Sequence, residues 1–248
     1  MYAAGVGARL KSAFGGRSKI LLEFGGKSLL EWHLVRLTEV GVKQLTLVTG
    51  YQHQWVEQAL PALRERYPIQ IAALHNPDFA EGSILSLAAS VPVLQSLPAG
   101  EPVLLMDGDV LYPAEFLRRL IASPHRTALL IDREFSTADD DPVLVPIAEG
   151  RPFDFVKKWK GAAETVGESV GFFKVADDDV RELISLTQSM SVGAGRAASY
   201  DDVVRRMVQA GRFGHEDITG LPWTEIDFPA DVERATLEVL PAIAAICR

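Results

Sequence analysis

The N-terminal segment combines glycines with basic side chains. Gly5 and Gly7 form a G-x-G pair, Arg9 follows two residues later, and Lys19 comes ten residues after that. Glycines let a backbone approach a phosphate closely and offer N–H donors, while arginine and lysine neutralise phosphate oxygens. The pattern is not a dinucleotide fingerprint, because Leu10 stands where its third glycine belongs, and it lacks the P-loop spacing. It predicts a site for a small anion, with a solvated basic loop as the alternative.

Two further segments place carboxylates at the end of a strand or along one. Asp107 and Asp109 flank a glycine directly after the apolar stretch Val103–Met106, at the strand end where open α/β sheets bind ligands. Glu225 and Asp227 are two residues apart, so a short strand would point both to one face. Carboxylate oxygens are the ligands that Mg²⁺ favours. A metal site is one interpretation, and a simple turn with a solvated edge strand is the other.

The distribution of charge also favours a small anionic ligand. The net charge of the 248 residues is −8, yet residues 1–30 carry five basic side chains and one acidic side chain. An acidic chain disfavours nonspecific binding to nucleic acid or to an anionic membrane. The sequence shows neither a membrane-spanning apolar run of about 18 to 20 residues nor a signal peptide, so we expect a cytoplasmic protein.

The cysteine and histidine content offers no other metal chemistry. Cys247 is the only cysteine, which excludes a disulfide framework and a cysteine-based metal site. The five histidines lack metal-ligand spacing, and we interpret them as surface or packing residues.

Alternating apolar runs and helical patterns predict the elements that position these residues. The pattern predicts helices over 29–39, 55–65, 85–94, 114–121, 178–186, 201–210 and 231–246, and strands over 45–49, 69–74, 103–106, 128–131, 143–147, 153–156, 169–175 and 223–226. This order predicts an α/β fold with a mixed, mainly parallel sheet flanked by helices, and an antiparallel lid layer at about 140–175. No linker divides the chain, so we expect a single domain over 1–248.

The start of the sequence is unusual for such a fold. A parallel α/β domain places its first strand immediately before a glycine-rich loop, but Gly5 is only four residues from the start. Either the first strand is nearly absent or the sequence begins downstream of its natural start.

The three motifs together resemble the nucleotidyltransferase superfamily, which makes nucleotide-activated sugars and alcohols from an NTP and a phosphate monoester. The loop match runs from Ala3 and Ala4 to Lys19, and the pattern W-x-E-I-D-x-P-x-D-x-x-x-A begins at Trp223. Looser matches resemble the cytidylyltransferase branch that handles phosphocholine, aminoethylphosphonate or inositol phosphate. The resemblance covers nearly the whole chain and implies a Rossmann-like fold of the nucleotide-diphospho-sugar transferase type.

The resemblance also assigns roles to single residues. It implies nucleotide contacts for Ala3, Ala4, Gly5, Gly7, Ser83, Ser86 and Asp107, and acceptor contacts for Glu168, Gly171, Tyr200, Asp201, Trp223 and Glu225. It implies that Arg9, Lys19 and Lys158 are catalytic, with Lys157 as the alternative to Lys158, and that Asp109 and Asp227 bind Mg²⁺. Ser83 departs from the asparagine that many members of this branch have at this position.

These observations lead us to expect a Mg²⁺-dependent cytidylyltransferase that joins CTP to a small phosphate or phosphonate monoester. Aromatic and acidic residues in the acceptor motifs favour phosphocholine or 2-aminoethylphosphonate, because an ammonium group is attracted to aromatic faces. A sugar-1-phosphate or inositol-phosphate nucleotidyltransferase using CTP or another NTP is the first alternative. A GT-A-type glycosyltransferase and a non-catalytic nucleotide-binding subunit are alternatives of other classes. The oligomeric state stays open.

Overall fold

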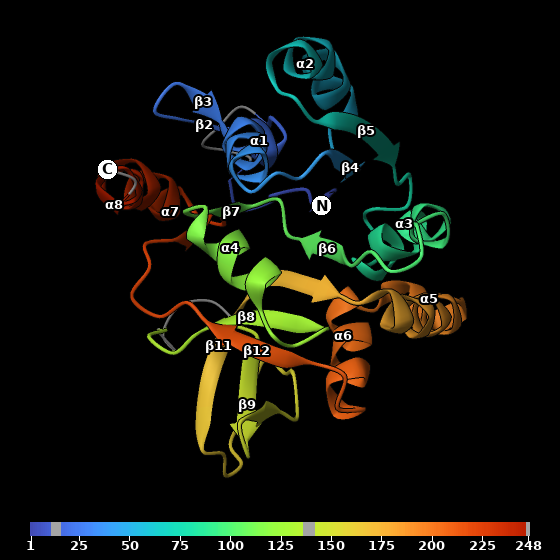
Figure 1. Cartoon of the computed structure of the whole chain (residues 1–248). Coiled ribbons are helices and arrows are strands. Elements are labelled where there is room, and N and C mark those ends of the chain that lie inside the picture. The colour runs from blue at the N-terminus through green and yellow to red at the C-terminus, as the bar shows by residue number, and fades with distance from the viewer. Residues whose placement is uncertain (11–15, 136–141, 247–248) are drawn as a thin grey trace. The chain divides into compact units, whose positions relative to one another are not determined.

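The computed structural model describes residues 1–10, 16–135 and 142–246, and the chain forms two compact units (Figure 1). Unit 1 comprises Met1–Ala80, Asp107–Arg118 and Leu221–Arg248, and unit 2 comprises Glu81–Met106 and Arg119–Gly220. The glycine-rich loop, the Asp-Gly-Asp segment and the segment that begins at Trp223 all belong to unit 1. The three motifs of the sequence therefore meet within one compact part of the chain.

A three-stranded parallel sheet in the order β1–β4–β5 forms the centre of unit 1. β1 (Tyr2–Ala3) pairs with the end of β4 (Gln44–Thr49), and β4 pairs along its whole length with β5 (Gln70–His75). Parallel neighbours need a crossover connection. α1 (Leu29–Glu39) lies on the path from β1 to β4, and α2 (His53–Arg66) connects β4 to β5.

Short elements complete unit 1 and contribute to a buried apolar cluster. They are η1 (Lys19–Leu21), β2 (Glu23–Phe24), β3 (Lys27–Ser28), β7 (Val110–Leu111), β13 (Thr224–Glu225), α7 (Pro229–Arg234), the π-helical η3 (Ala235–Val239) and α8 (Leu240–Ile246). One buried apolar cluster joins them to α1 and consists of Leu10, Leu22, Phe24, Leu29, Leu111, Ile226, Ala235, Val239 and Ile243. This core fixes β7 beside β13, the two strands next to the predicted metal ligands.

Local sequence sets both ends of α1. The Ser28 hydroxyl accepts a hydrogen bond from the Glu31 N–H at 3.2 Å, and the Glu31 carboxylate accepts one from the Ser28 N–H at 2.9 Å. This capping box fixes the first turn of the helix. Gly41 follows the last turn with a φ of 80°, a conformation that glycine adopts without strain. The predicted helix over 29–39 is confirmed, and the side chains on its inner face have fixed positions.

Unit 2 contains a six-stranded sheet in the order β10–β9–β11–β8–β12, with β6 also paired with β11. Its strands are β6 (Val103–Met106), β8 (Ala128–Asp132), β9 (Leu144–Ala148), β10 (Arg151–Pro152), β11 (Thr165–Val175) and β12 (Gly214–Asp217). Only β8 and β12 form a parallel pair among these described strands. The antiparallel strands expected for the region 140–175 are thus part of a larger sheet.

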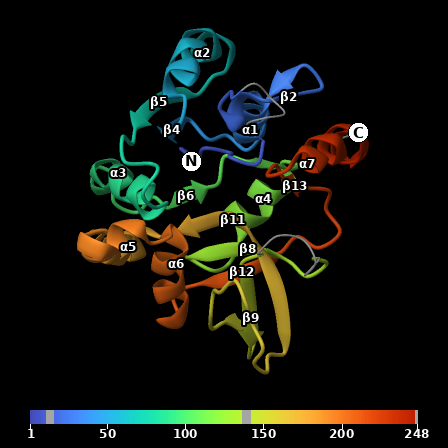
Figure 2. The same ribbon diagram turned by 180° about the vertical axis from the view of Figure 1, so that it is seen from behind.

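Helices cover part of unit 2. They are α3 (Ile84–Gln95), α5 (Asp177–Met190), η2 (Gly193–Ala197) and α6 (Tyr200–Gln209), while α4 (Glu115–Ala122) contains the boundary between the units. α3, α5 and α6 pack against one another, as Figure 2 shows from behind. Among the described residues, no helix has the length and apolar character needed to cross a membrane.

One expectation about local structure is wrong. The predicted strand over 153–156 is not formed; β10 covers Arg151–Pro152 instead, and Val156 makes only a single bridge to Leu144. The Asp154 carboxylate accepts a hydrogen bond from the neighbouring Phe155 N–H at 2.9 Å, a local bond that competes with strand pairing. The predicted closing helix over 231–246 is confirmed as continuous helix from Pro229 to Ile246, in which the π-helical η3 lies between α7 and α8. The single domain over 1–248 stays a prediction, and Cys247 lies outside the described residues.

Candidate active site

Asp107, Gly108 and Asp109 connect β6 to β7 and enter unit 1 at Asp107. β7 pairs antiparallel with β13, which places Val110 opposite Glu225. The Asp109 carbonyl also accepts a hydrogen bond from the Ile226 N–H at 2.9 Å. This pairing brings two segments more than 100 residues apart in the sequence side by side. As a result, carboxylates from both segments gather at one place.

The gathered carboxylates can bind a divalent cation. Oxygens of Asp109, Glu225 and Asp227 all lie within 4.8 Å of one another. The Asp109 Oδ1 atom is buried and has no hydrogen-bond partner among the described residues. A buried carboxylate oxygen without a partner is costly, and a hard cation such as Mg²⁺ would satisfy it. The donor set therefore fits Mg²⁺, and the two predicted ligands, Asp109 and Asp227, lie together.

Lys19 occupies the space between the two predicted metal ligands. Its Nζ atom lies 2.8 Å from Asp109 Oδ2 and 2.5 Å from Asp227 Oδ1, and its side chain is 13% exposed. Burial disfavours the charged ammonium, but the charges and hydrogen bonds of the two carboxylates outweigh burial and raise the pKa of Lys19 above its ordinary value. Lys19 is thus a permanent cation at the site.

Arg9 lies at the rim of the same cluster. Its guanidinium Nη1 is 4.0 Å from Asp227 Oδ2, and its Cζ lies 4.6 Å from the centre of the Phe228 ring. Its side chain is 55% exposed, so the ion pair itself contributes little to stability. The aromatic contact orients a guanidinium that remains accessible to an anionic ligand.

Glu225 adds a third carboxyl group to the cluster of Asp109 and Asp227. Partial withdrawal from water, followed by the charges of Asp109, Asp227 and Asp107, raises the pKa of the Glu225 carboxyl well above its ordinary value. The Glu225 residue as a whole is exposed, so we attribute the shift mainly to the neighbouring charges rather than to burial. Several carboxylates thus face one buried ammonium and one exposed guanidinium, and the cluster can accept a further cation.

The glycine-rich loop lies beside Lys19. Gly7 has a φ of 56°, and a Cβ atom at this position would contact the Lys19 side chain at 3.7 Å. Ala3 ends β1, and the buried Ala4 accepts a hydrogen bond from the Tyr51 N–H through its carbonyl at 3.0 Å. Gly5 is exposed. The loop therefore begins at an anchored strand, and residues 11–15 within it lie outside the described residues.

In unit 2, the predicted nucleotide residue Ser83 contacts the start of α6. The Ser83 hydroxyl lies 3.1 Å from the Ser199 hydroxyl and accepts a hydrogen bond from the Tyr200 N–H at 3.0 Å. The Ser199 hydroxyl donates to Asp201 at 2.8 Å. Burial raises the pKa of Asp201, although this hydrogen bond opposes the shift. Ser86 is buried in the first turn of α3. Three predicted residues, Ser83, Tyr200 and Asp201, thus belong to one hydrogen-bonded network.

The remaining predicted residues are placed as follows. Lys157 and Lys158 are both exposed, and the charge of Lys157 acts on Asp201. Glu168 lies on β11 opposite Asp132. Gly171 has a φ of 72° where the register of β11 against β8 shifts, so the local backbone favours glycine there.

Trp223, in unit 1, has its ring centre 6.3 Å from that of Phe116. The assignment of Glu168, Gly171 and Trp223 to acceptor binding stays a prediction, as does that of Lys158, or alternatively Lys157, to catalysis.

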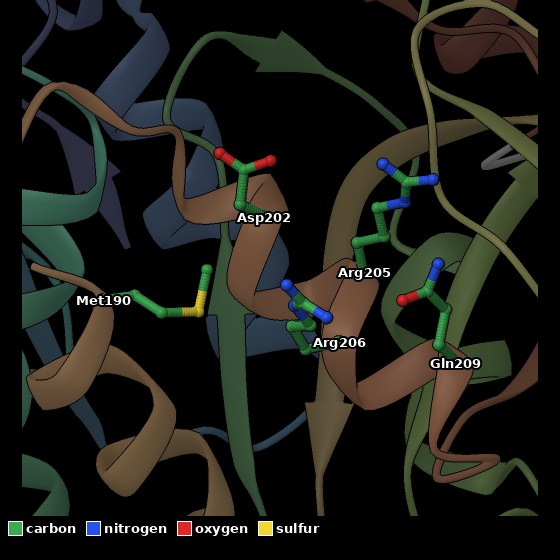
Figure 3. A pocket seen from close by; sticks show the side chains of 5 residues that line it. All are labelled: Met190, Asp202, Arg205, Arg206 and Gln209. Atoms are coloured by element: carbon green, nitrogen blue, oxygen red, sulfur yellow. The ribbon is translucent and has the colours of Figure 1, made fainter. Parts of the chain in front are cut away.

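A separate pocket of unit 2 has a volume of about 340 Å³. It is lined by Met190, Asp202, Arg205, Arg206 and Gln209, and Figure 3 shows four of these side chains extending from α6. Arg205 is already engaged, because its guanidinium donates to both carboxylate oxygens of Asp154. None of the residues predicted to bind nucleotide, metal or acceptor lines this pocket.

Sequence reasoning missed one polar residue beside the site. His33 of α1 is completely buried and contacts the carbonyl of Gly108, between the two aspartates. A histidine on the apolar face of a predicted helix was the only signal for it, and that signal is also typical of a packing residue.

Comparison with known proteins shows a family match over most of the chain. The chain matches the family described as MobA-like NTP transferase domain over residues 2–174. It is 28% identical to CMP-5'-(3-aminopropyl)phosphonate synthase of Streptomyces rubellomurinus, over 96% of this chain but only 38% of that protein's length. It is 26% identical to N-acetylmuramate alpha-1-phosphate uridylyltransferase of Neisseria meningitidis serogroup B, over 90% of each chain.

A solved structure gives the same fold. The inositol-1-phosphate CTP transferase from T. maritima superposes with a TM-score of 0.77 at 23% identity, over 99% of this chain and 94% of that one. This similarity confirms the expected fold of the nucleotide-diphospho-sugar transferase type, with a parallel sheet, flanking helices and antiparallel strands.

Proposed function

The chain belongs to the MobA-like NTP transferase domain family, and from this premise we propose that it is a Mg²⁺-dependent cytidylyltransferase. The proposed reaction joins CTP to a small phosphate or phosphonate monoester and releases pyrophosphate. The observation that carries the proposal is the contact of Lys19 Nζ with both Asp109 and Asp227. These three side chains combine a phosphate-neutralising cation with the ligands for a divalent cation.

The reaction requires little of the protein beyond positioning the two substrates and neutralising their charges. An oxygen of the acceptor attacks the α-phosphorus of CTP in line, a new P–O bond forms, and the bond to the β-phosphate oxygen breaks. Pyrophosphate leaves with the electron pair of the broken bond. The attacking oxygen is already an anion near neutral pH, so no side chain has to remove a proton. Catalysis then consists of holding two anions together and neutralising them.

Residues of unit 1 supply this neutralisation. We assign the triphosphate to the loop that contains Gly5 and Gly7, with Lys19 and Arg9 neutralising its oxygens. Asp109 and Asp227 would hold Mg²⁺, which when bound neutralises phosphate oxygens as a Lewis acid. Removing either carboxylate would leave Lys19 with one partner and the cation with too few ligands.

For the acceptor we propose phosphocholine or 2-aminoethylphosphonate. The name of the Streptomyces relative, an aminopropylphosphonate synthase, supports an amine-bearing phosphonate. Lys158 is proposed to reduce the repulsion between acceptor and nucleotide, and Asp201 to contact the acceptor. The Neisseria relative is named for a sugar phosphate, so a sugar-1-phosphate acceptor is the second candidate.

The proposal is tested with a panel of four NTPs against phosphocholine, 2-aminoethylphosphonate, inositol 1-phosphate and a hexose 1-phosphate, with and without Mg²⁺. We expect Mg²⁺-dependent pyrophosphate release that is fastest with CTP and an amine-bearing acceptor. Faster turnover of a sugar or inositol phosphate would change the acceptor and leave the reaction class intact. Release of a nucleoside diphosphate from a nucleotide-sugar donor, with no pyrophosphate from any NTP, would identify a glycosyltransferase, and CTP binding without turnover would indicate a nucleotide-binding subunit.

A further inference from the structure

A buried histidine of α1 holds the peptide between the two aspartates of the Asp-Gly-Asp segment. The His33 side chain has no exposed surface. Its Nε2 atom lies 3.3 Å from the Gly108 carbonyl oxygen, and its Nδ1 atom lies 3.2 Å from the Tyr112 hydroxyl. Both ring nitrogens thus have a partner in the segment that connects β6 to α4.

The partners of His33 determine where its proton lies. Burial lowers the pKa of His33 to about 3, so the ring is neutral and carries one N–H. The Gly108 carbonyl can only accept a hydrogen bond, so Nε2 carries the hydrogen and donates it. Nδ1 then accepts from the Tyr112 hydroxyl. Each member of this network has one role, and none can be reversed without losing a hydrogen bond.

The Gly108 peptide is held on both sides. Its N–H donates to the Tyr2 carbonyl at 2.9 Å, and its carbonyl accepts from His33. A Cβ atom at this position would come within 2.9 Å of the Tyr2 carbonyl oxygen, so the two backbones approach as closely as only glycine permits. Because the Gly108 peptide is fixed, the Cα and Cβ atoms of the next residue, Asp109, have little freedom to move.

A second residue of α1 holds the following turn. Arg36, one helical turn after His33, donates from Nε to the Tyr112 carbonyl at 3.4 Å. Its Nη1 atom lies 2.9 Å from the Glu39 carboxylate, and its guanidinium lies 5.1 Å from the centre of the Trp32 ring. One face of α1 therefore contacts the site segment at two points.

We propose that His33, through Gly108, is a positioning residue for the cation-binding carboxylate of Asp109, and that Tyr112 fixes the orientation of its ring. The proposal rests on the proposed function, in which Asp109 binds the divalent cation. Groups that orient metal ligands without touching the metal commonly change its affinity by about 10- to 100-fold when they are replaced.

The test measures the binding of Mn²⁺ alone, by the electron paramagnetic resonance signal of the free ion, in matched variants. His33→Leu removes both hydrogen bonds, and we expect Mn²⁺ affinity to fall by about 10-fold or more. His33→Gln keeps one N–H donor and one acceptor and should stay within about 3-fold of the wild type. Tyr112→Phe keeps its ring but removes the partner of Nδ1, and should lie between them.

Leu37→Ala is the control for a merely structural effect. Leu37 is a buried apolar residue of the same helix with 2% exposure. Its truncation should lower the thermal midpoint, as truncation of buried side chains does, with Mn²⁺ affinity unchanged. Nitrogen chemical shifts of His33 should also show Nε2 protonated in the wild type.

The outcomes separate this proposal from the proposed function. Equal Mn²⁺ affinity in wild type, His33→Leu and Tyr112→Phe would overturn the positioning role, and so would a wild type that does not bind Mn²⁺. If His33→Leu does not fold, Tyr112→Phe and His33→Gln still decide the question. Absence of turnover with every NTP and acceptor would instead contradict the proposed function, whatever the Mn²⁺ comparison shows.

Discussion

The two units hold their predicted functional residues in different ways. In unit 1, Lys19 contacts the carboxylates of Asp109 and Asp227 directly, so the charged groups have one another as partners. In unit 2, Ser83 and Asp201 are hydrogen-bonded around the N-terminus of α6 and thereby connect it to the start of α3. The charged groups of unit 1 are therefore already assembled as a set, whereas these residues of unit 2 also join two helices. Substitutions in the two units should therefore have different kinetic signatures.

The largest expected effect is the loss of the metal ligands of unit 1. Asp109→Ala or Asp227→Ala should reduce Mg²⁺-dependent turnover by on the order of 10³-fold, because each carboxylate would bind the cation. The measurement is pyrophosphate release at saturating CTP, with circular dichroism to show that the fold is kept. Glu57→Ala, an exposed acid on α2, is the control. A loss of only a few-fold would exclude the assigned ligands.

Lys19→Met should show two opposite effects. Turnover should fall by about 10²-fold, because a charge that neutralises the triphosphate is lost. Binding of Mn²⁺ without nucleotide should become tighter by several-fold, because an ammonium no longer competes for Asp109 and Asp227. Lys27→Met is the control, since Lys27 lies outside the acid cluster and has its Nζ 5.1 Å from the centre of the Trp32 ring. Weaker Mn²⁺ binding in Lys19→Met would show that lysine and cation do not share these ligands.

In unit 2, Asp201→Asn should change acceptor binding alone. If its carboxylate contacts an acceptor ammonium group, the KM for that acceptor should rise by about 10-fold while the KM for CTP stays the same. Initial rates with each substrate varied in turn distinguish the two constants, and Asp178→Asn on α5 serves as the control. An equal rise in both KM values would indicate that Asp201 acts by holding α6 in place. The difference between charged groups that contact substrate in unit 1 and residues that join helices in unit 2 would then be larger.

Features that depend on residues close together in the sequence could be predicted from it. Ser28 and Gly41 mark the two ends of α1 because capping depends on residues within one turn of the helix end. The parallel strands β4 and β5 could be recognised because each is a short segment rich in leucine, isoleucine or valine. The basic loop with Arg9 and Lys19 could be recognised for the same reason, since spacing within a short segment sets its chemistry.

Features that depend on distant partners could not be predicted. β12 (Gly214–Asp217) has the sequence Gly-His-Glu-Asp, which has low strand propensity, and it forms a strand because it pairs with β8. The contact between Lys19 and Asp227 joins residues 208 positions apart. It depends on the pairing of β13 with β7 and on the position of η1, neither of which a local pattern shows. The role of His33 was hidden because the pattern shows that it faces inward but does not show what it meets there.

The remaining expected effect is on acid stability rather than on turnover, and it compares unit 1 with and without its buried histidine. Burial lowers the pKa of His33 to about 3, below its ordinary value near 6.5. Below pH 6.5 the unfolded chain therefore takes up a proton at His33 that the folded chain does not, so this group makes the folded state less stable as pH falls. Between pH 7 and pH 5 the loss should be about 2 kcal/mol of unfolding free energy.

His33→Gln has no such proton uptake, so its loss over the same interval should be smaller by about that amount. Urea unfolding of both proteins at the two pH values, followed by tryptophan fluorescence, measures the difference. Equal losses of unfolding free energy in the wild type and in His33→Gln would mean that His33 is also protonated in the folded protein. The donor to the Gly108 carbonyl would then be a charged imidazolium rather than a neutral ring.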